Sequence, residues 1–230
     1  MERCCEPELM DDIQQVQAYA DADFSVGDQA VVERIAELFP EGPGPRLVDL
    51  GCGPGNISFR LAERFPLATV LGLDGAAAML AVAEGRRRRW RQGPGAERPE
   101  RLTFQRCLLP LTPGDRAAMA GGFTAVVSNS LLHHLHDPLV LWRAVAELAA
   151  PGAAVYIKDL RRPASPEAAR ALLSRHLVDA PPVLQRDFLA SLHAAFEPEE
   201  VVEQLRASGL AQLQVRPLDD RYLEVWGRLA

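Results

Sequence analysis

The chain has little of what nucleic-acid-binding proteins need, because positive charge is scarce. Its 230 residues include a single lysine, Lys158, beside 24 arginines, and acidic residues outnumber basic ones to give a formal net charge of −6. Such a chain lacks the overall positive field that neutralises phosphates, so we expect no nucleic-acid partner. The preference for arginine, together with abundant alanine, is typical of a GC-rich coding sequence and points to a bacterial source.

Cysteine and long apolar runs are also scarce. Four cysteines are scattered along the chain without a Cys-x-x-Cys pair, which is not the pattern of a disulfide scaffold. The N-terminal stretch MERCCEPELMDD has no apolar signal-peptide centre, and no uncharged run of about 18 apolar residues occurs. We therefore expect a cytoplasmic protein without a membrane partner, as a monomer or a homodimer.

The hydrophobic pattern predicts an α/β fold. Two amphipathic helices, at 7–22 and 26–39, precede a connector rich in proline and glycine. Apolar strands then alternate with helices, and strands that are apolar throughout indicate a parallel sheet covered on both faces. The five strands are expected at 46–50, 69–73, 102–107, 123–128 and 153–158, and the tail is expected to add helices at 167–178 and 197–208 and a hairpin of 210–215 and 222–226.

A glycine-rich turn, GCGPG at 51–55, follows the first strand and leads into a helix. Glycines let such a turn close tightly and let a ligand approach the main-chain N–H groups, and the unpaired N–H groups of the helix start face the same point. Asp49 ends the first strand, and Asp74 ends the second, 19 residues after Gly55. A carboxylate at the end of the second strand can accept hydrogen bonds from ribose hydroxyls, so the pattern predicts a nucleoside site.

The spacing of the glycines distinguishes two nucleoside cofactors. Dinucleotide sites carry G-x-G-x-x-G, whereas this turn reads G-x-G-x-G with an acid two residues before its first glycine. A carboxylate there repels a pyrophosphate and suits a cationic group such as an α-amino group or a sulfonium. The pattern favours S-adenosylmethionine over NAD and leaves a nicotinamide oxidoreductase as a disfavoured alternative.

Three stretches in order, VDLGCGPGN (48–56), VLGLDGAAAML (70–80) and FTAVVSNSLLHHLHDP (123–138), resemble the class I S-adenosylmethionine-dependent methyltransferases, and YIKDLRRP (156–163) is similar to the family's fifth strand and its exit. The resemblance covers about residues 46–159. It implies a doubly wound, Rossmann-like sheet of seven strands, mostly parallel with one antiparallel strand and with helices on both faces. We expect the following residues at the cofactor: Tyr19, Asp49, Gly51, Cys52, Gly53, Gly55, Asp74, Gly75, Met79, Cys107, Leu108, Asn129 and Ser130.

The same resemblance divides the chain, which we predict to form one domain over 1–230. Residues 1–40 are expected to form an N-terminal helical cap and 46–160 the cofactor-binding core. Residues 161–200 would then be a substrate lid, and 201–230 a closing helix and hairpin.

One departure from the family lies at Cys107. Family members usually carry an acid there, which receives the exocyclic amine of adenine, whereas a neutral thiol accepts hydrogen bonds weakly. Either the backbone at Cys107 and Leu108 takes this role or adenine is held loosely. A reactive thiol is the alternative to a small buried filler at a strand end, and the filler is favoured.

Three residues are candidates for catalysis. His133 and His134 follow the fourth strand, and an imidazole with a pKa of about 6.5 suits proton removal near neutrality. Packing of the loop is the competing interpretation of both histidines. Asp159, at the exit of the fifth strand, is expected to orient a substrate amine or hydroxyl, and Arg161 or Arg162 to meet a carboxylate.

Two further patterns are not expected to form sites. No metal is predicted at His133, His134 and His136, because neighbours on one element seldom converge and no acid partner is evident. The run GRRRRWRQGPGAERPER at 85–101 is interpreted as a solvated helix end with a surface loop rather than a phosphate-binding patch.

Methyl transfer from a sulfonium is an in-line displacement that depends mainly on alignment and exclusion of water. The sequence SNSL after the fourth strand differs from the Asn/Asp-Pro-Pro-aromatic motif of enzymes that methylate exocyclic amines. We therefore expect a small-molecule acceptor, methylated at O, N or C. The alternatives are an S-adenosylmethionine-binding enzyme of other chemistry and a non-catalytic cofactor-binding subunit. The presence of Asp49, Asp74 and all three glycines favours an enzyme.

Overall fold

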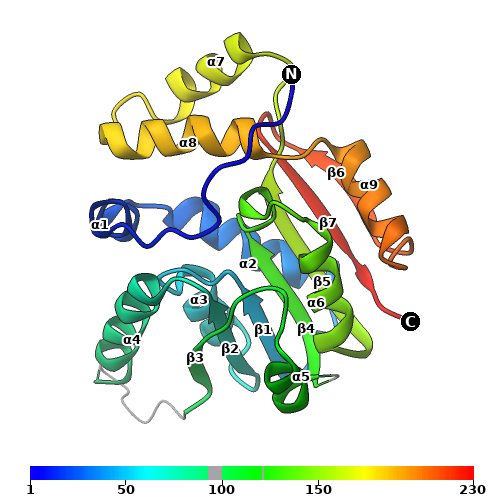
Figure 1. Ribbon diagram of the computed structural model, residues 1–230. Coiled ribbons are helices and arrows are strands. Elements are labelled where there is room, and N and C mark those ends of the chain that lie inside the picture. The colour runs from blue at the N-terminus through cyan, green and yellow to red at the C-terminus, as the bar shows by residue number, and fades with distance from the viewer. Residues whose placement is uncertain (93–99, 121) are drawn as a thin grey trace.

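A single seven-stranded sheet organises the computed structural model, which describes residues 1–92, 100–120 and 122–230 (Figure 1). The strand order is β3-β2-β1-β4-β5-β7-β6. Strands β1 to β5 are parallel, and β7 runs antiparallel to both of its neighbours, as predicted. The strands are β1 (Arg46–Leu50), β2 (Thr69–Asp74), β3 (Leu102–Arg106), β4 (Phe123–Asn129), β5 (Ala149–Leu160), β6 (Gln214–Leu218) and β7 (Tyr222–Arg228).

Helices cover both faces of the sheet because side chains alternate along each buried strand. Leu47 of β1 packs in one core with α2 and α3, whereas the next residue, Val48, packs in the other core with α6 and α9. The helices are α1 (Ile13–Asp21), α2 (Ser25–Leu38), α3 (Asn56–Arg64), α4 (Ala77–Gln92), α5 (Pro113–Met119), α6 (Leu139–Leu148), α7 (Pro166–His176), α8 (Pro182–Ala194) and α9 (Pro198–Ala207), with a 3-10 turn, η1 (Leu132–His134). No helix among the described residues is both long and apolar enough to cross a membrane.

The structure differs from the sequence-based expectation at helix starts. Helix α8 was not predicted, although it begins at Pro182; proline fits the first turn of a helix, where its missing N–H is not needed. Helix α5 was also missed, although Thr112 and Asp115 form a capping box at its start. Helix α1 begins at Ile13 instead of residue 7, because Asp12 caps it through the backbone N–H of Gln15.

Residues 1–12 consequently have no helix and form an extended N-terminal strap. In Figure 1 the strap descends from the α7–α8 pair towards α1. Arg3 fixes it in place: the guanidinium donates hydrogen bonds to the carbonyl of Ala194 at the end of α8 and to those of His133 and Leu135 around η1. The same guanidinium stacks 3.9 Å from the ring centre of Phe196. The strap therefore joins the α7–α8 pair to the carboxyl end of β4.

Candidate active site

The carboxyl ends of β1, β2 and β4 open into one cavity, which we call the cofactor cavity. Twelve of the thirteen residues predicted to contact the cofactor line it, from Tyr19 on α1 to Ser130 after β4. The exception is Gly55, which precedes α3 with φ +86°. A Cβ at Gly55 would lie 2.8 Å from the Phe104 ring, so this glycine serves the turn and its packing rather than the cavity wall.

The first position of the turn also requires glycine, both for its backbone conformation and for lack of space. Gly51 has φ +68°, and a Cβ there would lie 2.9 Å from the side chain of Leu131. Its N–H and that of Cys52 both donate to the carbonyl of Leu73 at the end of β2. The turn is thus fixed against β2 and faces the cavity with its backbone.

Asp49 and Asp74 are the two carboxylates of the cofactor cavity. Asp49 is 1% exposed and accepts a hydrogen bond from the Ser58 hydroxyl at 2.5 Å. Burial raises the pKa of Asp49 to about 7, against the lowering effect of Ser58, and the nearby charge of Asp74 raises it further. An Asp49 carboxyl of this kind takes up or releases a proton near neutrality and is stabilised as an anion by any cation placed beside it.

Asp74 holds the turn and the start of α4 together. Its Oδ2 accepts the N–H of Gly53 at 2.7 Å, and its Oδ1 accepts that of Ala76 at 2.8 Å. Burial raises its pKa, and these backbone hydrogen bonds oppose that rise. Each carboxylate oxygen can accept a second hydrogen bond, so the two oxygens are still able to receive hydroxyl groups of a ligand.

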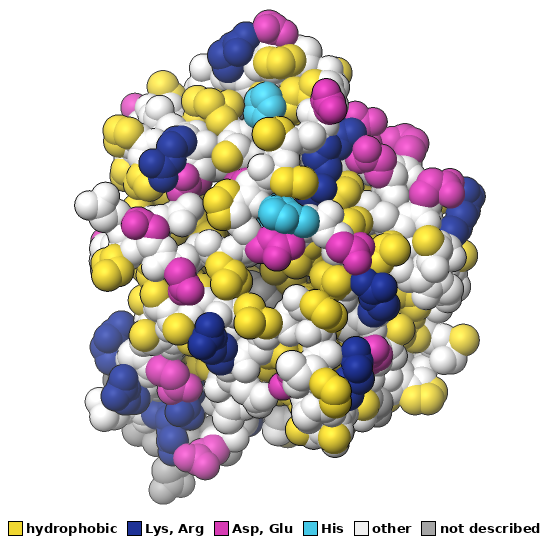
Figure 2. All heavy atoms as spheres, viewed as in Figure 1, with side chains coloured by type: hydrophobic (Ala, Val, Ile, Leu, Met, Phe, Trp, Pro, Cys, Tyr) yellow, Lys and Arg dark blue, Asp and Glu magenta, His cyan; other side chains and the backbone are white. Residues whose placement is uncertain are grey.

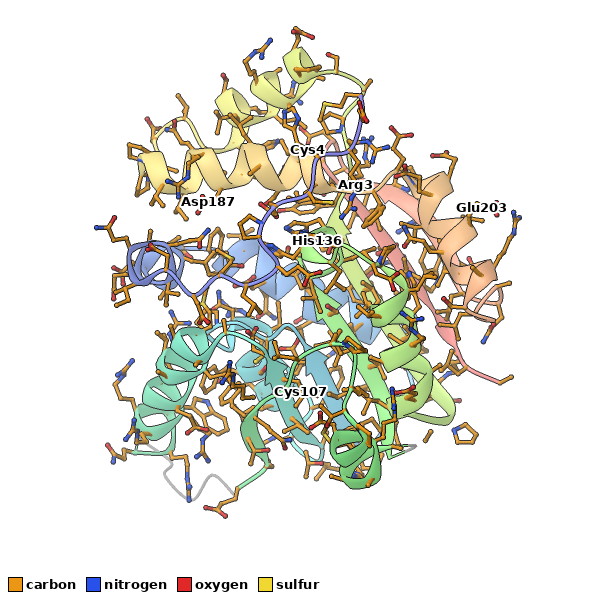
Figure 3. All side chains as sticks on the ribbon, in the orientation of Figure 1. Arg3, Cys4, Cys107, His136, Asp187 and Glu203 are labelled. Atoms are coloured by element: carbon orange, nitrogen blue, oxygen red, sulfur yellow. The ribbon has the colours of Figure 1, made fainter. Side chains whose placement is uncertain are left out.

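The third strand leads to Cys107, where the family usually has an acid. Burial raises the pKa of the Cys107 thiol to about 11, which keeps it protonated and supports a filler over a reactive thiol. The Cys107 thiol also lies far from Cys4 on the strap. Figure 3 places Cys4 on the strap beside α8 and Cys107 far below it, at the end of β3.

A second cavity of about 530 Å³ adjoins the first, and we call it the acceptor cavity. This volume is within the range of small-molecule sites. Its walls come from α1 and α2, from the α7–α8 pair in the predicted lid, and from β5 and β7. The two cavities share a junction, lined by Met10, Tyr19, Asp28, Asn129, Ser130 and His134.

Of two buried residues at the junction, one could be predicted from the sequence and the other could not. Tyr19 was predicted, and its ring packs 4.8 Å from that of Phe24, while burial raises the pKa of its hydroxyl. Asp28 was missed, because it stands in an ordinary amphipathic helix without a motif. It is 7% exposed, and burial raises its pKa while Arg60, 3.8 Å away, lowers it.

Lys158 is a second residue that the sequence did not single out. It lines the acceptor cavity from β5, is 8% exposed, and places its Nζ 3.9 Å from the ring centre of Tyr222. Among the described residues no carboxylate oxygen lies within 4.0 Å of this Nζ. Burial lowers its pKa, and the charge of Asp28 raises it in part. The acceptor cavity thus contains a buried cation without a close carboxylate partner.

The two arginines expected to meet a carboxylate have other partners. Arg162 pairs with Glu200 at 2.8 Å and donates to the carbonyl of Ala195. Arg161 donates to the carbonyls of Asp219 and Asp220 in the β6–β7 turn. Neither arginine lines the cofactor cavity or the acceptor cavity, because both side chains tie the exit of β5 to neighbouring elements.

The candidates for catalysis are coupled to one another and to the strap. His133 is 2% exposed, with Nδ1 2.5 Å from Asp159 Oδ1 and Nε2 3.5 Å from Glu6 Oε1. Burial alone would lower the pKa of His133, but Asp159 and Glu6 raise it above its ordinary value. The ring is therefore held between two carboxylates, which favours a structural role over a free general base.

The other two candidates have separate roles. His134 lines both cavities, and burial lowers its pKa far below the ordinary value, with a further contribution from His133. Asp159 lines neither cavity, contrary to its expected role on the substrate, and its Oδ2 accepts the N–H of Leu132 at 2.7 Å. The expectation that no acid partner exists for the histidines is wrong, because Glu6 of the strap provides one.

The arginine-rich run is only partly solvated. Figure 2 shows Lys and Arg side chains gathered over the α4 region at the lower left. Arg86, however, donates to the Pro54 carbonyl, to Asn56 Oδ1 at 2.6 Å and to the Ala20 carbonyl at 2.6 Å, so it ties α4 to the glycine turn and α1. Residues 93–99 of the run lie outside the described residues.

Known proteins with similar sequences include methyltransferases. A family model described as a methyltransferase domain matches residues 48–155. The chain is 36% identical over 135 residues to a trans-aconitate 2-methyltransferase of Deinococcus radiodurans, covering 59% of this chain and 45% of that protein. It is 29% identical over 195 residues to a ubiquinone biosynthesis O-methyltransferase of Vibrio parahaemolyticus, covering 84% of this chain and 75% of that one. The chain therefore spans less than half the length of the first of these relatives.

Solved structures share the fold over nearly the whole chain. A SAM-dependent methyltransferase from Aquifex aeolicus superposes with a TM-score of 0.63 at 16% identity, covering 95% of this chain and 99% of that one. The plantazolicin methyltransferase BamL, solved with a triazolic desmethylPZN analog and SAH, gives 0.67 at 13% identity, covering 94% and 90%. The sheet order and the matched family model agree: residues 48–155 match a methyltransferase domain, and the fold is that of S-adenosylmethionine-dependent methyltransferases.

Proposed function

We propose that the protein transfers a methyl group from S-adenosylmethionine to a small molecule that carries a carboxylate. The observation that carries this proposal is the junction of the two cavities, where a nucleoside-type site opens beside a cavity containing the buried Lys158. When bound, S-adenosylmethionine supplies a methyl group activated by its sulfonium.

The residues of the cofactor cavity fit such a ligand. The glycine turn offers backbone close to the ligand, Asp49 suits the α-amino group and Asp74 the ribose hydroxyls. Tyr19, Asn129 and Ser130 at the junction orient the reacting groups and exclude water. The buried Oδ1 of Asn129 has no hydrogen-bond partner among the described residues, so it is free to accept one from a ligand.

A carboxylate acceptor explains two features of the acceptor cavity. Lys158 provides a buried positive charge for it, and a carboxylate oxygen is already ionised near neutrality, so its methylation needs no general base. This agrees with the engagement of His133 by two carboxylates. The Deinococcus relative is named for trans-aconitate, which is a tricarboxylate.

The test is a methyl-transfer assay on the purified full chain. The protein is incubated with S-adenosylmethionine and, separately, trans-aconitate, other di- and tricarboxylates, phenols and amines. S-adenosylhomocysteine release and the mass gain of the acceptor are then measured. We expect turnover with a carboxylate and a methyl ester as the product. Turnover with phenols or amines alone would overturn the acceptor class, and binding of the cofactor without turnover on any acceptor would favour a non-catalytic subunit.

A further inference from the structure

Glu6, His133 and His134 bring three potential metal ligands together between the strap and η1. One oxygen of Glu6 and one nitrogen from each histidine all lie within 4.8 Å of one another. Their side chains are 10%, 3% and 14% exposed, so this is an interior cluster instead of a group of surface acids. The third histidine of the run, His136, is 57% exposed and does not join it.

The spacing of the three ligand atoms is that of a small coordination sphere. His133 Nε2 lies 3.5 Å from Glu6 Oε1, and His134 Nδ1 lies 3.1 Å from the same oxygen. Two ligands of a tetrahedral zinc ion, each about 2.0–2.2 Å from the metal, are separated by roughly 3.3–3.6 Å. The two distances to Glu6 are close to this separation, and the two imidazole nitrogens lie within 4.8 Å of each other.

His134 Nδ1 gives a second reason to place a cation here. It is buried and has no hydrogen-bond partner among the described residues, while the ring takes part in a hydrogen bond with the backbone of Pro7. This nitrogen lies 3.1 Å from the Oε1 atom of Glu6, a separation that is favourable when a proton or a metal ion lies between the two atoms.

The groups behind the ligands are arranged as they are around known metal sites. Asp159 accepts from Nδ1 of His133 at 2.5 Å, which leaves Nε2 on the side of Glu6. The Ser191 hydroxyl donates to both oxygens of Glu6, at 3.0 and 3.3 Å, and so orients that carboxylate. Asp187 adds negative charge near Glu6, whereas Arg3 is the cation that faces the cluster.

We propose that Glu6, His133 and His134 form a binding site for a divalent transition-metal ion of the Zn²⁺ type. Two imidazoles and one carboxylate suit such an ion, and three protein ligands leave a position for water or an acceptor oxygen. His133 and His134 line the acceptor cavity, so that position is next to the small-molecule site. The metal would also fasten the strap to η1. This inference does not rest on the proposed function.

The test measures metal binding directly, without cofactor or acceptor. The full chain is treated with a chelator, titrated calorimetrically with Zn²⁺, and loaded with Co²⁺ for visible absorption. We expect one ion per chain, tetrahedral Co²⁺ bands, and a thermal unfolding midpoint that rises with Zn²⁺. Asp159→Asn, which only loosens a ligand, should weaken binding roughly 10–100-fold. Glu6→Gln and His134→Ala remove ligands and should weaken it more.

Two controls separate this site from adventitious binding. His176→Ala removes a histidine that also lies beside a carboxylate, Asp220 at 2.8 Å, and should leave the Zn²⁺ affinity unchanged. Binding should persist when the exposed Cys4 and Cys5 are both replaced by serine, with no thiolate charge-transfer band from Co²⁺. Circular dichroism checks that each variant is folded.

Three results would overturn the proposal. The first is the absence of Zn²⁺ heat and of Co²⁺ bands at micromolar concentrations, which would mean that a proton alone lies between Glu6 and His134. The second is binding that survives both Glu6→Gln and His134→Ala. The third is binding that disappears with the two cysteines.

Discussion

The cofactor cavity and the acceptor cavity share a junction but are assembled differently. The first takes most of its wall from strand ends and the turns directly after them, at 49–57, 73–79, 107–109 and 129–131, and it presents much backbone. The second is made of side chains from α1, α2, β5, α7, α8 and β7, which are far apart in sequence. A site made by turns at strand ends follows from local pattern, whereas a site made between helices depends on how the whole chain packs.

The largest effect is expected from Asp74→Ala, which tests the cofactor side of this comparison. The change removes a carboxylate that accepts two backbone hydrogen bonds and is expected to accept the ribose hydroxyls. Hydrogen bonds to charged groups contribute about 1.5–3 kcal/mol each, so affinity for S-adenosylhomocysteine should fall by roughly a hundredfold or more. Calorimetric titration measures it, with the exposed Glu41→Ala as control. Unchanged affinity would contradict the assignment of Asp74.

The stability of the sheet that supports both cavities should depend on a buried ion pair outside them, and Glu224→Gln tests this. Glu224 is fully buried in β7, where it accepts from Arg34 of α2 at 3.1 Å and from Arg216 at 2.6 Å. Removing one partner of a buried pair costs about 3 kcal/mol, at the lower end of the usual range because both arginines are partly exposed. Chemical unfolding measures the loss. A change below about 1 kcal/mol would show that the pair is screened like a surface one.

Lys158→Met should separate the two cavities functionally. It removes the buried positive charge from the acceptor cavity and keeps most of the side-chain volume. With the carboxylate identified in the methyl-transfer assay, KM should rise roughly tenfold or more, while affinity for S-adenosylhomocysteine stays within about twofold. The reverse result, weaker cofactor binding at an unchanged KM, would assign Lys158 to the other cavity.

These expectations also show how far the sequence leads. Strands β1 to β5, the glycine turn and the carboxylates at 49 and 74 could be predicted because a turn after a buried strand has a local signature in glycine spacing and in a polar residue at the strand end. Strand β6 was expected at 210–215 but lies at Gln214–Leu218. Asp28 carries no such signature, since one buried acid in an amphipathic helix looks like its solvated neighbours. The meeting of Glu6 with His133 could not be predicted either, because it depends on a strap that crosses the finished fold.

At a proline pair and at one arginine the structure also differs from the sequence-based expectation, for the same physical reason. The pair Pro181-Pro182 stands at the start of α8, and this helix forms because its apolar residues pack against α7 and the end of β5. Arg86 looks like its neighbours in the arginine run, yet its guanidinium donates to carbonyl groups in the glycine turn and α1. Local pattern sets which conformations are possible, and tertiary contacts choose among them.

The smallest expected effect is a pH dependence of ligand binding that arises in the cofactor cavity and not in the acceptor cavity. Burial raises the pKa of Asp49 to about 7, so the carboxyl is mostly protonated at pH 6 and mostly ionised at pH 8. A cationic α-amino group needs the ionised form, and its binding should therefore release a proton. Affinity for S-adenosylhomocysteine should rise roughly tenfold across this interval, because a group one pH unit below its pKa is about one-tenth ionised. The Asp49→Asn variant should bind S-adenosylhomocysteine more weakly at pH 8 and lose the pH dependence.

The same raised pKa means that Asp49 destabilises the free fold as pH rises from about 4 to 7, so the cofactor should stabilise the protein more at pH 8 than at pH 6. Calorimetry in two buffers of different ionisation enthalpy measures the released proton, and a pH-independent affinity in the wild type would assign the amino group to another partner.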